Sequence, residues 1–161
     1  MLISQITAAL ALQRWPWQWR AEDRMTEFAL VGDIGGTNSR FGLVKQGSMA
    51  IQHMEALRND SFPSLEGAIQ QYLRNQDVNS LASAAIAVAA PVDREHISLT
   101  NYDWSFTTES LRLAAKARRL RLLNDYEALA LSLPHLKGDD LIQIGGQESP
   151  VPKLKIVLGP G

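Results

Sequence analysis

Apolar residues along this chain follow two periods, one typical of strands and one typical of helices. The first three predicted strands are short apolar or alternating runs bounded by turns, at Glu27–Asp33, Ser39–Lys45 and Met49–Leu57. Only a short span with glycines separates the first two, so we expect them to pair as an antiparallel hairpin. Three antiparallel strands therefore open the predicted fold.

Helices and strands alternate over the rest of the chain. Apolar residues at three- and four-residue spacing predict a helix from Phe62 to Leu73, with Ser61 as its cap and Pro63 in its first turn. Two further helices are predicted, from Thr107 or Thr108 to about Ala117 and from Tyr126 to Leu133. The other predicted strands are Ala84–Ala90, His96–Thr100, Arg119–Leu123 and Leu154–Leu158, with NYDWSF as a loop. This order predicts an α/β domain with a mixed sheet covered by helices.

The length of 161 residues suits one domain with a sizeable core, which we place at residues 25–161. Residues 1–24 stand apart, because tryptophans alternate around Pro16 after a mildly apolar segment. The sequence MTEFALVGD, which begins at Met25, is typical of a natural start. We expect the extension to have no fold of its own; an aromatic segment lying on a membrane surface is the alternative.

Charge and composition narrow the classes of function. The net charge of −1 gives no indication of a nucleic-acid or membrane partner, and the basic run Lys116–Arg121 spans a predicted helix end, where positive charge complements the helix dipole. The chain has no cysteine, which excludes thiolate chemistry and fits a reducing compartment, so we expect a cytoplasmic location. No apolar run approaches the roughly 20 residues that span a bilayer. The histidines lack metal-ligand spacing.

The first candidate for chemistry is the turn VGDIGGTNSR, residues 31–40. Its glycines have neither the spacing of a Walker phosphate loop nor that of a dinucleotide fingerprint, but they would let backbone N–H groups approach an anion. Asp33 would repel a phosphate unless a cation lay between them, and Mg²⁺ binds through one or two carboxylates plus substrate phosphates. Thr37 adds a hydroxyl donor. The stretch therefore fits a metal–nucleotide site; a plain hairpin turn with Asp at a turn position is the alternative.

The second candidate is the pair Asn124 and Asp125, where a predicted strand gives way to a helix. In open α/β sheets, ligands bind outside the carboxyl ends of strands. A carboxylate there can accept a proton from a substrate hydroxyl, and an adjacent amide can bind another hydroxyl. The alternative is that Asp125 only caps the following helix, since Asp is among the best N-caps.

Together the two candidates resemble sugar kinases of the actin/hexokinase fold. VGDIGGTNSR is similar to their first phosphate motif, D-x-G-G-T-x-x-R, and LLNDYEALALSLP is similar to the stretch around their catalytic aspartate. FPSLEGAIQQYL, AIAVAAPV, SLTNYDWSF and LIQIGGQ follow the order and spacing of one subgroup, the bacterial glucokinases. The closing VLGPG is similar to the start of their second phosphate motif. The resemblance runs from about Thr26 to Gly161 and implies the amino-terminal, ribonuclease H-like or actin-like ATPase lobe, with a mixed five-stranded sheet.

The resemblance also implies a reaction and a role for each matching residue. The reaction would be ATP-dependent phosphorylation of glucose to glucose 6-phosphate, with Asp125 as the general base for the sugar 6-hydroxyl. Asn124 would bind a neighbouring hydroxyl, and Asn101 lies in a family motif near the sugar. The ATP-binding loop would comprise Gly32, Asp33, Ile34, Gly35, Gly36 and Thr37. Asp33 would hold Mg²⁺ through water, and full-length members would be homodimers.

The chain also departs from the family that it resembles. Family members are considerably longer, and their further part supplies other sugar ligands and the adenine pocket. We therefore expect no measurable glucose phosphorylation from these 161 residues alone, as for a gene fragment. The alternative function is a non-catalytic sugar-binding or regulatory protein on the same lobe. Residues 1–24 are too short and not basic enough for the helix-turn-helix domain of related repressors, which weighs against it.

Overall fold

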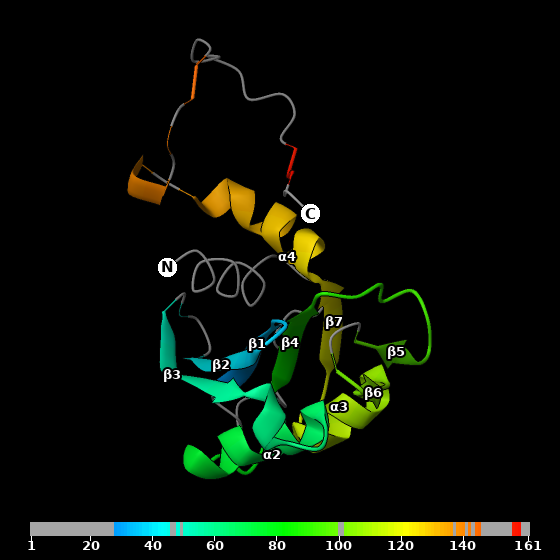
Figure 1. The fold of residues 1–161 in the computed structure, drawn as a ribbon. Helices are drawn as coiled ribbons and strands as arrows, with labels where there is room; N and C mark the ends of the chain where they lie inside the picture. Colours follow the sequence, from blue (N-terminus) through cyan, green and yellow to red (C-terminus); the bar gives the residue numbers. More distant parts are fainter. Residues whose placement is uncertain are drawn as a thin grey trace.

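The computed structural model describes residues 28–45, 48, 50–99, 102–136, 138–140, 142, 144–145 and 156–158. Five strands form one mixed sheet in the order β3-β2-β1-β4-β7 (Figure 1). The strands are β1 (Phe28–Ile34), β2 (Asn38–Lys45), β3 (Ile51–Arg58), β4 (Ser83–Val88) and β7 (Leu120–Asn124). β1, β2 and β3 pair antiparallel, whereas β4 runs parallel to both β1 and β7. The predicted α/β class, the opening hairpin and the mixed five-stranded sheet are therefore confirmed.

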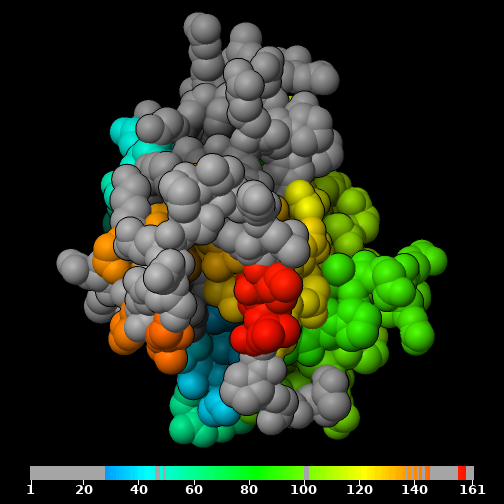
Figure 2. All heavy atoms as spheres, turned by 90° about the horizontal axis from the view of Figure 1, so that it is seen from above, coloured from blue at the N-terminus to red at the C-terminus, as the bar shows by residue number. Residues whose placement is uncertain are grey.

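Helices cover both faces of this sheet (Figure 1). α2 (Leu65–Asn75) and α3 (Thr108–Ala114) lie on one face, over the large apolar core, and α4 (Asp125–Ser132) lies on the other. A smaller apolar cluster between the sheet and α4 contains Ala85, Ala87, Leu123 and Ala128. Alternate residues of β4 enter the two clusters, which explains its uninterrupted apolar run. Figure 2 looks onto the α4 face and shows α4 (yellow) beside residues 156–158 (red).

The start of α2 differs from the prediction. Asn59–Ser61 form a 3-10 helix, η2. Phe62 is extended, because Pro63 disfavours the helical conformation of the residue before it. Ser64, not Ser61, caps α2: its hydroxyl accepts a 3.2 Å hydrogen bond from the Gly67 N–H. Thr107, one of the two start positions that we predicted, is the N-cap of α3.

Two predicted strands differ in the structure. In place of His96–Thr100 there is β5 (Ile97–Ser98), which lies outside the main sheet and pairs with β6 (Ser105–Phe106) in the segment predicted as a loop. Ile97 pairs with Phe106, and both side chains are buried. Of the predicted strand Leu154–Leu158, residues 156–158 form no strand, and the rest lies outside the described residues.

Two short 3-10 helices come after α4. The 3-10 helix η3 (Leu133–His135) follows α4 directly and contains Pro134, which suits the first turn of a helix, and η4 (Gly138–Asp140) comes next. Across the residues that the structure describes, no helix has the length and apolar character that crossing a bilayer requires.

Candidate functional site

The candidate site lies at the carboxyl edge of the sheet, where β1, β4 and β7 end together. Asp33, near the end of β1, is in register with Ala87 of β4, which in turn pairs with Leu123 of β7. Asn124 and Asp125 follow Leu123 directly, at the end of β7 and the start of α4. The structure therefore brings the two sequence candidates to one edge, the edge at which ligands bind in open α/β sheets.

Asp33 is a half-buried carboxylate under three electrostatic influences. Its side chain is 25% exposed, and its Oδ2 atom lies 3.6 Å from Nη1 of Arg40, the residue opposite it in the hairpin. Burial raises the pKa of Asp33 above its ordinary value; the Arg40 guanidinium lowers that pKa, and the Asp125 carboxylate raises it again. A buried carboxylate with a second carboxylate nearby favours a cation at this position.

The turn after β1 is tight, and it presents backbone donors to solvent. The Gly35 N–H donates to the Asn38 carbonyl at 3.0 Å, which closes the hairpin. Gly36 and Thr37 are exposed, and among the described residues no acceptor takes their backbone N–H groups. The predicted hairpin turn and the predicted anion-binding loop are thus compatible descriptions of the same residues.

The other residues of the predicted ATP loop serve the core. Ile34 is 2% exposed and belongs to the large apolar cluster. Gly32 is buried as well, and a Cβ at this position would lie 3.2 Å from Cδ1 of Phe41. The glycine at position 32 therefore allows close packing between β1 and β2. Only Asp33 and the Gly35–Thr37 turn face the candidate site.

Asn124, not Asp125, is the N-cap of α4. The Asn124 Oδ1 atom accepts a 3.0 Å hydrogen bond from the Tyr126 N–H, and its Nδ2 atom donates to the Ala90 carbonyl at 3.2 Å. Asp125 is the first residue of the helix, and its Oδ1 atom accepts from the same Tyr126 N–H at 2.9 Å. The predicted alternative of Asp125 as the helix cap thus applies mainly to its neighbour Asn124, and the Asp125 Oδ2 atom has no protein donor among the described residues.

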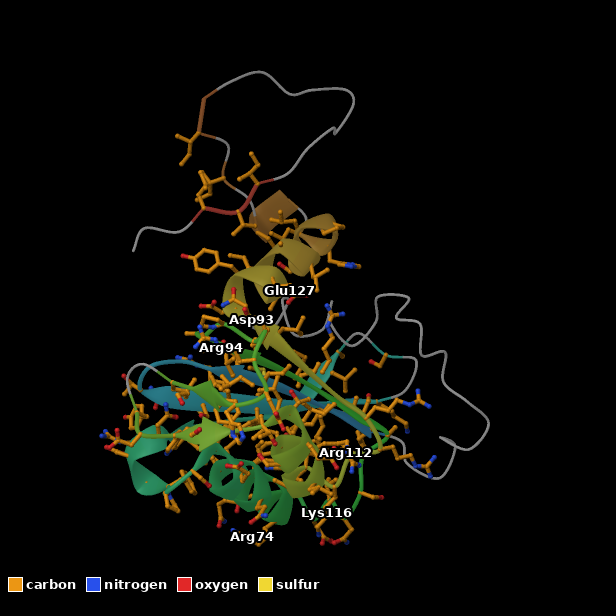
Figure 3. All side chains as sticks on the ribbon, turned by 90° about the vertical axis from the view of Figure 1, so that its right-hand side faces the viewer. Arg74, Asp93, Arg94, Arg112, Lys116 and Glu127 are labelled. Atoms are coloured by element: carbon orange, nitrogen blue, oxygen red, sulfur yellow. The ribbon has the colours of Figure 1, made fainter. Side chains whose placement is uncertain are left out.

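The two ends of the sheet carry different charged residues. Asp93 and Arg94, in the loop after β4, lie at the same end as Glu127 in the first turn of α4, whereas Arg112 and Lys116 lie at the opposite end (Figure 3). The basic run that begins at Lys116 therefore starts far from the candidate site. Asn101, the remaining predicted sugar residue, lies outside the described residues.

Two residues of this edge were given no role by the sequence. Arg40 lies in the motif that carries the resemblance. The predicted hairpin places it opposite Asp33 across the turn, so this pairing could have been predicted from the sequence. Asn59, which follows β3, contacts the Gly35–Thr37 turn from outside the hairpin. No local pattern in the sequence indicates that second contact, because it joins segments far apart in the chain.

Comparisons with known proteins agree with each other. The family model described as Glucokinase matches residues 30–161. The glucokinase of Marinobacter nauticus is 37% identical over 134 residues, covering 83% of this chain and 42% of that protein. The glucokinase of Ralstonia nicotianae is 41% identical over 136 residues, covering 82% of this chain and 40% of that protein. A crystal structure of a glucokinase from an Antarctic psychrotroph superposes with a TM-score of 0.64 at 30% identity, over 70% of this chain and 37% of that chain. The chain thus spans about 40% of the length of the curated relatives that it matches.

Proposed function

Because the chain belongs to the glucokinase family, as the match over residues 30–161 shows, we propose that it forms the part of an ATP-dependent glucose kinase that holds the nucleotide phosphates and the catalytic base. One observation carries this proposal: Asp33 and Asp125 lie at the same edge of the sheet, where the Asp125 carboxylate raises the pKa of Asp33. Asp33 adjoins a turn in which the N–H groups of Gly36 and Thr37 have no acceptor among the described residues, and Asp125 begins a helix. Phosphoryl transfer needs these two functions side by side, since it depends on positioning and charge stabilisation.

The Gly35–Thr37 turn supplies the phosphate contacts in this proposal. The N–H groups of Gly36 and Thr37 have no acceptor among the described residues and lie at exposed positions, so they can donate to phosphate oxygens. The Thr37 hydroxyl adds a third donor. Arg40 now pairs with Asp33, and its side chain is 41% exposed, so a phosphate at the turn would offer its guanidinium a second acceptor.

The carboxylate oxygens at this edge fit Mg²⁺. The described residues contain no group of three or more His, Cys, Asp or Glu side chains that could enclose a metal. Mg²⁺ does not require one, because it usually keeps several waters and binds through one or two carboxylates and substrate phosphates. The Asp33 carboxylate, directly or through water, is the residue that would hold it. When bound, Mg²⁺ would neutralise charge on the phosphates.

Asp125 is the proposed general base. Its Oδ1 atom accepts from the Tyr126 N–H, which orients the carboxylate. Oδ2 can then accept the proton of the glucose 6-hydroxyl as that oxygen attacks the terminal phosphoryl group. The Asn124 side-chain amide has two N–H groups, and only one of them donates to the Ala90 carbonyl. The other can therefore bind a neighbouring sugar hydroxyl.

Nucleotide titration of the isotope-labelled 161-residue chain tests this proposal. We expect Mg·ATP at millimolar concentrations to shift the backbone amide resonances of Gly35, Gly36 and Thr37, and Asp33→Asn to weaken that response. Asp77→Asn is the matched control, because Asp77 is an exposed carboxylate after α2 with a positive φ that asparagine also tolerates. A wild-type chain in which Mg·ATP moves none of the three turn amides would overturn the proposal.

A further inference from the structure

Asn59 is a fully buried polar residue, and two of its hydrogen bonds go to the Gly35–Thr37 turn. Its exposed fraction is 0%, and it lies where β3 ends and η2 begins. We infer that Asn59 is a positioning residue that fixes the Gly35–Thr37 turn in the conformation that receives phosphate. This inference rests on the proposed function, since it concerns how the same site is held ready for its ligand.

Asn59 forms hydrogen bonds with the first and third residues of the turn, Gly35 and Thr37. Its Nδ2 atom donates to the Gly35 carbonyl at 2.9 Å, and its backbone N–H donates to the Thr37 carbonyl at 3.0 Å. Its Oδ1 atom accepts a 2.8 Å hydrogen bond from Oγ of Ser39, which is also 0% exposed. The side-chain amide is thereby oriented, because Ser39 can donate only to its oxygen and Gly35 can accept only from its nitrogen.

Peptide geometry turns these contacts into an orientation of donors. In a trans peptide the C=O and the following N–H point in opposite directions. When Asn59 holds the Gly35 carbonyl on the protein side, the Gly36 N–H must therefore point away from Asn59. That N–H belongs to an exposed residue and has no acceptor among the described residues. Asn59 thus aims the central donor of the proposed phosphate loop outward.

The turn needs such an anchor because of its composition. Glycine populates many backbone conformations, so Gly35-Gly36 can flip the peptide between them at low cost. A flipped peptide would direct the Gly35 carbonyl oxygen toward a phosphate, and the partial negative charge on that oxygen would repel the phosphate. Preorganised donors bind an anion more tightly, because ordering them costs nothing at the moment of binding.

Substitution of Asn59 separates positioning from general stability. We expect Asn59→Ala in the 161-residue chain to weaken Mg·ATP binding roughly tenfold, as for the loss of one oriented donor, and to shift or broaden the Gly36 amide resonance before any ligand is added. Thr107→Ala is the matched control, because it removes an N-cap hydrogen bond of 3.0 Å in α3 without touching the turn. This variant should lose comparable stability, keep the Gly36 resonance and bind Mg·ATP as the wild type does.

The outcomes distinguish this inference from the proposed function. If wild type and Asn59→Ala bind Mg·ATP with equal affinity, and the Gly36 resonance is unchanged, the inference is wrong while the proposed function stands. If the wild type itself does not bind, both fall. Should Asn59→Ala fail to fold, Asn59→Ser provides the same test, because its hydroxyl keeps a polar partner for Ser39 but is too short to reach the Gly35 carbonyl.

Discussion

The Asp125 carboxylate raises the pKa of Asp33, although Asp33 lies in β1, Asp125 directly follows β7, and β4 separates these two strands. Two strand spacings correspond to roughly 10 Å, a distance over which charges in water interact weakly. The interaction persists because Asp33 is half-buried. A cation between the two carboxylates would be attracted by both and would offset their repulsion.

Replacing Asp33 should stabilise the chain at neutral pH. Burial is the largest influence on the Asp33 pKa and raises it, so ionising this carboxylate costs more in the folded chain than in the unfolded chain. We expect Asp33→Asn to have a higher melting temperature than the wild type at pH 7, measured by circular dichroism, and to respond more weakly to Mg·ATP. Sites that bind ligands commonly carry such a cost in stability.

The difference in stability between Asp33→Asn and the wild type should depend on pH. Because the folded-state pKa of Asp33 is raised, its contribution to stability is present below the unfolded value and is lost as the pH rises through the folded value. The advantage of Asp33→Asn should therefore shrink as the pH falls from 7 to below about 4. Asp77→Asn serves as the control. A variant that melts below the wild type at pH 7 would contradict this account.

Asp125 should be required for catalysis and dispensable for folding. In a chimera of this chain with the segment of the Marinobacter nauticus glucokinase that the match leaves uncovered, we expect Asp125→Asn to lower kcat by about 10²–10⁴. The asparagine oxygen can still accept from the Tyr126 N–H, so the melting temperature should change little. The control is Glu127→Gln in the same helical turn. A coupled assay with near-normal kcat for Asp125→Asn would remove the residue from its role.

Asn124 should matter for stability as well as for the proposed sugar contact. Asn124→Ala removes the N-cap of α4 and leaves the Ala90 carbonyl without its side-chain donor. We expect the free energy of unfolding to fall by about 0.5–2 kcal/mol in a urea titration. Asn124→Ser keeps a capping oxygen and should recover most of that loss. Equal stability of Asn124→Ala and the wild type would show that the cap contributes nothing.

Two glycines should respond to alanine in opposite ways. A Cβ at Gly42 in β2 would overlap the Ile51 side chain of β3, so we expect Gly42→Ala to cost about 1–3 kcal/mol. A Cβ at Gly67 in the first turn of α2 would meet its nearest atom at 3.7 Å. Gly67→Ala should therefore stabilise the chain by about 0.5–1 kcal/mol through helix propensity. Urea titrations of the two variants check both signs, and equal effects would contradict the packing at Gly42.

Much of the fold follows from local pattern. The apolar period located β1, β2, β4 and β7 to within a few residues, since each buries a face against the core. The cap of α3 at Thr107 was equally readable, because capping depends on a hydroxyl a few residues from its N–H partner. The start of α2 was misplaced although its cause is also local: Phe62 precedes Pro63 and is extended, so Ser64 takes the capping position.

The sequence by itself determined the local parts of this protein: a tight glycine turn after one buried strand, and an Asn-Asp pair between another strand and its helix. Tertiary structure decided that they meet. Asp33 and Asp125 share an edge because β1, β4 and β7 lie parallel in that order, which is set by how the crossovers pack on the sheet. Only the fold could supply Asn59 to the Gly35–Thr37 turn, because this hydrogen bond joins residues that no local period relates.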